Sequence, residues 1–295
     1  MATFAWQGFE FQYPDDWECV RFSKDRRRGE CAFADRGGQR MNVIWSACSA
    51  GILPASLQAF TAEAVQQLSR TDKAGRIVNQ NWIGPGPWRG FQWSGAEHLT
   101  LAFAHFPESG YVLQVQFHDG RKPDGAVQRR MLENFRFQSA SPWRWSAFGC
   151  RLRLPREFEL TGCEVLAGRT TMTFTSPGRR GQRVRIERLA LPETQLKGKT
   201  LVNWRLGAID DARRVLKSNE RQLRGHAAAE FELKPARRTP AQWLTRVRRQ
   251  ARGMAWLCER EGRLYFVEWE GAEWEGAGGA TANFESMLEC CDAQT

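Results

Sequence analysis

Three histidines fall within one short stretch of the first half of the sequence, at His98, His105 and His118. Imidazole is a common zinc ligand, and side chains from neighbouring strands can converge on one ion. The second half of the chain has nothing comparable, since the matching positions there hold residues such as Leu257 and Glu270. We therefore interpret the three as isolated histidines of a sheet and predict no metal site.

Eight cysteines are scattered along the chain, without a Cys-x-x-Cys pair and without histidines at zinc-finger spacing. We expect most of them to be reduced and buried. Adjacent cysteines rarely form a disulfide with each other, so we expect none between Cys290 and Cys291. No nucleophile elbow and no persuasive Cys/His pair is present. The sequence therefore predicts no cofactor and no enzymatic activity. The cysteines are Cys19, Cys31, Cys48, Cys150, Cys163, Cys258, Cys290 and Cys291.

A strongly basic segment runs from Lys234 to Arg252 and contains no acidic residue. Thr239-Pro240 is typical of a helix start, with Thr as the N-cap and Pro at the first helical position. Trp243 opens an apolar stripe along the expected helix. Such a basic helix can dock on phosphates or on an acidic partner. Its candidate binding residues are Arg237, Arg238, Trp243, Arg246, Arg248, Arg249 and Arg252.

The alternative for this segment is an ordinary surface helix. Its arginines would then pair with Glu259, Glu261 and the acidic C-terminal part of the chain. The missing fold signature of a nucleic-acid-binding protein favours this alternative.

Tryptophans surround a second candidate site, the rigid loop 84–87 with the sequence Gly-Pro-Gly-Pro. Trp82, Trp88 and Trp93 flank it and can form an exposed binding patch. The other interpretation is that these three side chains pack the loop onto a sheet.

An internal repeat indicates the elements that position these residues. Residues 8–18 and 149–159 share an alternating strand, a proline that stops it and a large apolar residue three positions later. A helical apolar face near 57–68 recurs at 201–212, with Ser56 and Thr200 as matching N-caps. Three further matches follow in the same order: Arg89-Gly90 with Arg224-Gly225, Gly110–Phe117 with Gly262–Trp269, and Met131-Leu132-Glu133 with Met287-Leu288-Glu289.

These matches predict an α+β chain of two tandem similar domains, 1–139 and 145–295. A linker at 139–142 joins them, and the second domain carries the basic insertion around 234–252. In the first domain we expect strands near 7–13, 18–22, 29–35, 40–47, 89–94, 97–106 and 110–118, with helices near 56–70 and 124–135. Strands followed by helices favour an antiparallel sheet packed with helices.

Each half resembles the Mog1/PsbP-like family, including its DcrB-like branch. The resemblance rests on Tyr13-Pro14-x-x-Trp17, echoed by Leu154-Pro155-x-x-Phe158, and on the aromatic strand from Tyr111 to Phe117. A final amphipathic helix ending in residues 131–135 supports it. The resemblance implies an α/β/α sandwich with an antiparallel sheet, and a mostly non-catalytic family of accessory subunits, binders of other proteins and envelope proteins.

Composition and charge narrow the remaining classes. Hydrophobic residues make up 42% and charged residues 26%, as in globular proteins, and the formal net charge is +10. No apolar run approaches the ~18 residues that span a bilayer, and no signal peptide is recognisable. We expect a cytoplasmic protein without membrane insertion, as a pseudo-symmetric monomer.

The leading functional hypothesis is a non-catalytic protein-binding or scaffolding protein, whose partner is another protein. The alternative is a nucleic-acid-associated protein that uses the basic inserted helix. A third class is an enzyme or small-ligand binder with an inter-domain pocket.

Overall fold

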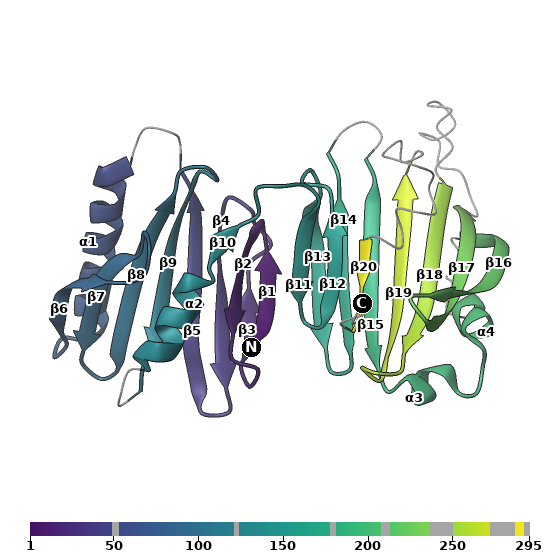
Figure 1. Ribbon diagram of the computed structural model, residues 1–295, viewed down its shortest axis with the longest axis horizontal. Helices are drawn as coiled ribbons and strands as arrows, with labels where there is room; N and C mark the ends of the chain where they lie inside the picture. The colour runs from purple at the N-terminus through teal and green to yellow at the C-terminus, as the bar shows by residue number, and fades with distance from the viewer. Residues whose placement is uncertain are drawn as a thin grey trace. The chain divides into compact units, whose positions relative to one another are not determined.

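The chain divides into two compact units, residues 1–140 and 141–295 (Figure 1). The computed structural model describes residues 1–48, 53–120, 124–177, 181–207, 213–235, 250–271 and 287–291. Both units are α+β, with antiparallel sheets and few helices, as predicted. No helix among these residues is long and apolar enough to cross a membrane.

The centre of the first unit is a seven-stranded antiparallel sheet of order β3-β4-β5-β9-β8-β7-β6. The predicted strands of this region are confirmed, but β6 was not predicted. Its polar run Asn79-Gln80-Asn81 breaks the apolar alternation that marks the other strands. The strands are β3 (Glu18–Phe22), β4 (Arg28–Asp35), β5 (Gly38–Ala47), β6 (Arg76–Ile83), β7 (Arg89–Ser94), β8 (His98–Phe106) and β9 (Tyr111–His118).

A smaller set of strands covers one face of this sheet. β1 (Ala2–Trp6) and β2 (Phe9–Tyr13) form a hairpin through Gln7 and Gly8, which both have positive φ angles, as a two-residue hairpin turn requires. β10 (Arg136–Phe137) then pairs with the other side of β2. Aromatic rings fill the interface: Phe4 packs edge-on against Phe33 of β4, with ring centroids 5.0 Å apart.

Two helices complete the first unit. Helix α1 (Leu53–Thr71) covers the opposite face of the sheet, where Phe60, Val65 and Leu68 pack against the cluster around Phe91 and Trp93. The predicted helix and its apolar face are therefore confirmed. The predicted cap Ser56 is wrong, because α1 begins at Leu53. Helix α2 (Gly125–Glu133) is capped by Asp124, whose side chain accepts a hydrogen bond from the Val127 N–H at 3.2 Å.

The second unit has a seven-stranded sheet with the corresponding order, β13-β14-β15-β19-β18-β17-β16. β11 (Trp143–Ala147) and β12 (Cys150–Leu154) form its first hairpin, through Phe148 and Gly149 with positive φ angles, and β20 (Leu288–Glu289) pairs with β12. The strands of the sheet are β13 (Glu159–Leu166), β14 (Arg169–Thr175), β15 (Arg183–Ala190), β16 (Arg213–Leu223), β17 (His226–Pro235), β18 (Gln250–Cys258) and β19 (Arg263–Gly271).

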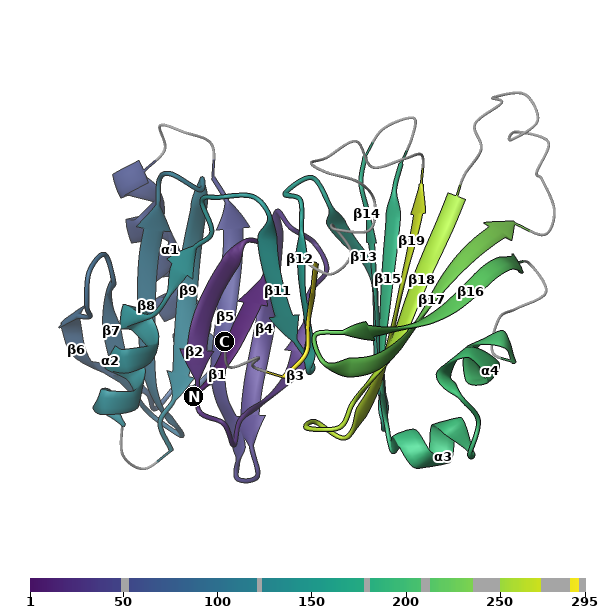
Figure 2. The same cartoon turned by 45° about the vertical axis from the view of Figure 1, so that its right-hand side comes forward.

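Helices of the second unit are short in the described residues: α3 (Pro192–Leu196) and α4 (Leu201–Leu206) (Figure 2). The predicted cap is confirmed, since the Thr200 hydroxyl accepts a hydrogen bond from the Asn203 N–H at 3.2 Å. Trp204 packs against the core around Phe231 and Phe266. The rest of the predicted helix, residues 208–212, lies outside the described residues.

Equivalent turns support two of the predicted repeat matches. Trp17 donates its backbone N–H to the Pro14 carbonyl at 3.1 Å, and Phe158 does the same to Pro155 at 3.0 Å. The strand pair β8–β9 and the pair β18–β19 both turn through a glycine with positive φ, Gly110 and Gly262.

Two other predicted matches are wrong. Arg89-Gly90 begins strand β7, whereas Arg224-Gly225 forms the turn between β16 and β17. Met131-Leu132-Glu133 belongs to helix α2, whereas Leu288-Glu289 forms β20. The equivalent of β20 is β10, because Arg136 lies opposite Glu10 of β2 and Glu289 lies opposite Arg151 of β12.

The packing of Phe33 yields a stability prediction. Its ring is fully buried and lies within 5.5 Å of the Phe4, Phe11 and Tyr13 rings. We expect Phe33→Ala to lower the free energy of unfolding of the first unit by about 3–5 kcal/mol, because it leaves a cavity. Urea denaturation measures this. Ile83→Ala, at a side chain that is 71% exposed, is the control and changes little; equal losses for both variants would contradict the prediction.

Burial of Cys150 yields a pH prediction. Burial raises the pKa of its thiol to about 12, because the core solvates a thiolate poorly. The neutral thiol stabilises the folded state below the unfolded pKa of about 8.5, and this contribution is lost as the pH rises toward the folded pKa. Between pH ~8 and ~10 we expect titration of Cys150 to lower the unfolding free energy of the unmodified protein by about 2 kcal/mol. The Cys150→Ala variant lacks this thiol, so its unfolding free energy should fall by about 2 kcal/mol less over the same pH range. Urea denaturation at both pH values tests this, and identical pH slopes in the two proteins would refute it.

Candidate functional site

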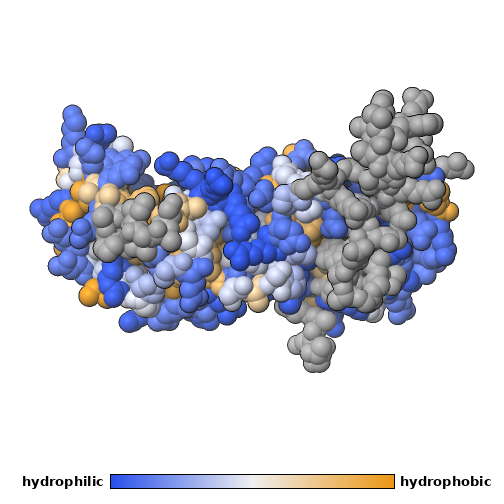
Figure 3. Space-filling model, turned by 90° about the horizontal axis from the view of Figure 1, so that it is seen from above, coloured by the Kyte–Doolittle hydropathy of each residue, from blue (hydrophilic) through white to orange (hydrophobic). Residues whose placement is uncertain are grey.

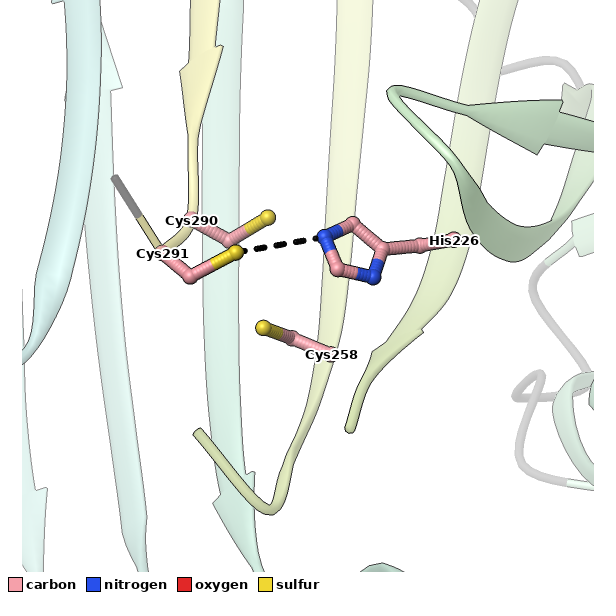
Figure 4. A group of neighbouring side chains, drawn as sticks. All are labelled: His226, Cys258, Cys290 and Cys291. Carbon is pink, nitrogen blue, oxygen red and sulfur yellow. Dashed lines mark hydrogen bonds between the residues drawn. The ribbon is translucent and has the colours of Figure 1, made fainter. Parts of the chain in front are cut away.

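One cysteine and histidine group is the candidate site of the second unit (Figure 4). His226 begins β17, Cys258 ends β18, and Cys290 and Cys291 directly follow β20. Their ligating atoms all lie within 4.8 Å of one another, and Cys291 Sγ is 3.4 Å from His226 Nε2. In the part of the chain that the structure describes, no other group of three or more His, Cys, Asp and Glu side chains is close enough to hold a metal ion.

Strand pairing explains why these four residues meet. β17 and β18 are antiparallel, with Ala228 opposite Trp256, so the start of one strand lies beside the end of the other. β20 pairs with β12 of the first hairpin, which covers one face of the sheet. The chain that leaves β20 therefore brings Cys290 and Cys291 onto the end of the β17–β18 pair.

The site is largely shielded from solvent. Cys258 is fully buried, Cys290 is 6% exposed, and His226 and Cys291 are half-buried. Burial raises the pKa of Cys290 to about 12, and it also raises the pKa of Cys291, with Cys258 as a further cause. Thiols with raised pKa values stay protonated and are poor nucleophiles. Three thiols and one imidazole nevertheless form a ligand set for a soft cation.

The first unit fills the equivalent corner differently. Phe106 ends β8 opposite Tyr111, as Cys258 ends β18 opposite Arg263. Phe137 follows Arg136 in β10, as Cys290 follows Glu289. The Phe106 and Phe137 rings pack with centroids 5.0 Å apart. An aromatic contact in one unit thus becomes a cluster of ligating side chains in the other.

The predicted tryptophan patch is wrong for two of its three residues. Trp88 is 1% exposed and Trp93 is 3% exposed, while Trp82 is half-buried. Trp88 packs edge-on against Phe135, and its indole N–H donates to the Leu132 carbonyl at 3.2 Å. Trp93 belongs to the cluster beneath α1. The alternative interpretation, that these side chains pack the loop, is confirmed for Trp88, whereas Trp93 is buried beneath α1 and not against the loop.

Most of the predicted basic segment lies outside the described residues. This applies to Arg237, Arg238, Trp243, Arg246, Arg248 and Arg249. Arg252 is described and lies in strand β18 opposite Glu232, so the expected helix does not extend to it. Of the acidic partners expected for this segment, Glu261 pairs with Arg151 at 3.5 Å.

The three histidines of the first unit do not converge. His98 begins β8, and His105 lies near its other end, opposite Val112. His118 ends β9 and contacts Glu97, with Nδ1 3.0 Å from the carboxylate. The sequence analysis missed the four residues that do converge, His226, Cys258, Cys290 and Cys291. Their proximity depends on the strand pairings β17–β18 and β12–β20, which the sequence does not reveal. The only signal in the sequence was the adjacent pair Cys290-Cys291.

Exposed apolar side chains also mark the outer strands of the sheets. Leu216 on β16 is 59% exposed, and Val78 and Ile83 on β6 are 55% and 71% exposed. On the face shown in Figure 3 the coloured surface is mostly hydrophilic, with apolar side chains in small groups.

Comparisons with known proteins give likeness at low identity. No protein-family model matches the chain, and no curated protein matches it. A cyanobacterial PsbP (CyanoP) from Synechocystis sp. PCC 6803 is 13% identical over 46% of this chain and 91% of its own, with a TM-score of 0.36. The type VI secretion immunity protein TplEi from Pseudomonas aeruginosa is 12% identical, over 96% and 93%, with a TM-score of 0.38. A chain of the Tle4–Tli4 complex is 10% identical, over 97% and 94%, with a TM-score of 0.40.

The burial of Trp88 generates a testable prediction. Trp88→Phe keeps the aromatic packing but removes the indole hydrogen bond to the Leu132 carbonyl, which retains the Phe135 backbone N–H at 3.3 Å. We therefore expect a loss of about 0.5–1.5 kcal/mol in unfolding free energy, the net value of one hydrogen bond. Urea denaturation measures it, with Trp82→Phe at the half-buried neighbour as the control. An exposed binding patch would instead give no stability change in either variant.

Proposed function

We propose that this chain is a non-catalytic binding protein that recognises an extended, acidic segment of another protein. The single observation that carries the proposal is the edge strand β16, which has an exposed apolar side chain and basic neighbours. The absence of a catalytic motif from the sequence supports the non-catalytic part.

The backbone of β16 is suited to strand addition. β16 spans 11 residues and, among the described strands, pairs only with β17. The outward N–H and C=O groups of such a strand can pair with an extended peptide. β16 has one register irregularity, between Val215 and Lys217, and Lys217–Leu223 are then regularly paired. β6, the corresponding edge of the first unit, has two irregularities, which protect an edge from pairing.

The side chains of β16 indicate the chemistry of the partner. Leu216 is exposed just before the regular run and offers an apolar anchor. Lys217 beside it is exposed, and Arg221 binds Glu230 of the neighbouring strand at 3.2 Å. Arg213 at the start of β16 lies opposite Pro235, the second residue of the basic segment 234–252. β16 itself carries four basic residues and one acidic residue, Glu220, and this excess of positive charge favours an acidic segment.

Nucleic acid is the second candidate partner, because the same arginines can bind phosphates. The two differ in what the edge strand does: a phosphate backbone uses the charges but not the ladder or Leu216. Phosphate binding also weakens steeply with salt. Nuclease treatment therefore separates the two partners, and a change at Leu216 tests the apolar anchor.

Native co-purification of the tagged full chain, with and without nuclease, tests the proposal. We expect a protein partner that survives nuclease and whose retention falls at least about 10-fold with Leu216→Glu, since a buried carboxylate in an acidic interface is costly. Val78→Glu, a similarly exposed apolar residue on β6, is the matched control and should retain the partner.

Two outcomes count against it. Bound material that disappears with nuclease supports the nucleic-acid alternative whether or not Leu216→Glu weakens it, because the added carboxylate also repels phosphates. A protein partner lost equally with Leu216→Glu and Val78→Glu shows that β16 is not the specific binding edge.

A further inference from the structure

The four residues His226, Cys258, Cys290 and Cys291 have the composition of a structural metal site. Three thiolates and one imidazole form one of the standard ligand sets of structural Zn²⁺. From this donor set and its geometry we infer that the second unit binds one Zn²⁺ ion at these four side chains. The inference does not depend on the proposed protein-binding edge.

The distances are close to those of a tetrahedral centre. With Zn–S near 2.3 Å and Zn–N near 2.0–2.1 Å, tetrahedral ligand atoms stand about 3.5–3.8 Å apart. Cys291 Sγ and His226 Nε2 already lie 3.4 Å apart, and no pair among the four ligating atoms exceeds 4.8 Å. Side-chain adjustments of about 1 Å therefore bring the widest pair to coordination distance. Figure 4 shows the four side chains pointing toward one another from three separate segments.

A buried donor beside the cluster fits a thiolate. The indole ring of Trp256 is 1% exposed and stacks on Tyr265 with centroids 4.9 Å apart, so its orientation is fixed. Its N–H is buried without an acceptor in hydrogen-bond geometry, yet it lies near enough to Cys290 to favour the charged form of that thiol. Metal-bound sulfur is a good acceptor for such an N–H group, and outer donors of this kind orient the ligands.

The ligand set also defines the role of the ion. Four protein ligands complete a tetrahedron, which leaves no open position for substrate, so the centre is structural rather than catalytic. Three thiolates and Zn²⁺ leave one negative charge, and the positive charge of Arg260 acts on Cys291. The ion fastens the chain after β20 to the end of the β17–β18 pair. In the first unit, packing between Phe106 and Phe137 holds the same corner.

Metal analysis of the full chain tests this inference directly. The protein is purified under reducing conditions, its zinc content is measured, and the zinc is exchanged for Co²⁺. We expect one Zn²⁺ per chain and, with Co²⁺, the ligand-field bands of a tetrahedral ion together with thiolate-to-cobalt charge transfer. X-ray absorption at the zinc edge should show three sulfur neighbours and one nitrogen. These readouts use the unaltered protein, so a variant that fails to fold cannot obscure them.

Variants then assign the ligands. Since loss of an outer hydrogen-bond partner already weakens metal binding 10–100-fold, we expect Cys291→Ser and His226→Gln to weaken Zn²⁺ binding by more than ~100-fold. Cys163→Ser is the matched control, because Cys163 is a half-buried cysteine of the same unit outside the group. It should keep one Zn²⁺ with unchanged affinity.

Three results would overturn the inference. The first is the finding that all eight thiols are reactive and that the protein takes up neither Zn²⁺ nor Co²⁺. Another is a disulfide between Cys258 and Cys290 or Cys291 in the freshly purified protein, found by mass spectrometry. The third is zinc that is bound equally by Cys291→Ser, His226→Gln and Cys163→Ser, which would place the ion elsewhere in the chain.

Discussion

Both units depend on a closing strand that returns to the first hairpin. β10 pairs with β2, and β20 pairs with β12, so the last described strand of each unit holds its first hairpin. An ion pair secures each closing strand: Arg136 with Glu10 in the first unit, and Glu289 with Arg153 at 2.6 Å in the second. The sign of the charges is reversed between the units, and the partner of Glu289 lies two residues beyond Arg151, the residue that corresponds to Glu10.

Closure creates a corner where the returning strand reaches the large sheet, and each unit needs side chains to fill it. In the first unit Phe106, Phe135 and Phe137 pack there as neighbouring rings. Cysteine is much smaller than phenylalanine, so the second unit buries less apolar area at this place. In the second unit His226 and three cysteines take the place of these rings. Their sulfur and nitrogen atoms give this corner potential metal ligands where the first unit has only apolar contacts.

The parts of the fold that were predictable from sequence are those set by local patterns. The alternation of Phe9, Phe11 and Tyr13 and the spacing of Phe60, Ala64 and Leu68 indicated β2 and α1, because burial of one face imposes a period. The matches of Arg89-Gly90 with Arg224-Gly225 and of Met131-Leu132-Glu133 with Met287-Leu288-Glu289 were wrong. Identities of two or three residues occur by chance, whereas structurally equivalent positions are defined by strand register. The cysteine–histidine group was out of reach for a related reason: residues separated by as many as 65 positions, such as His226 and Cys291, meet only through two strand pairings.

Closure also bears on how the chain acquires its structure as it is synthesised. The contact between Arg136 and Glu10 joins residues 126 positions apart, and the one between Glu289 and Arg153 joins residues 136 apart. Each first hairpin therefore leaves the ribosome long before its closing strand, β10 or β20, has been synthesised. Until then, the side of β2 or β12 that pairs with the closing strand stays unpaired. Contacts of such long sequence separation form slowly and leave strand edges open to association. The nascent chain is thus most exposed to misassembly while each closing strand is still being made.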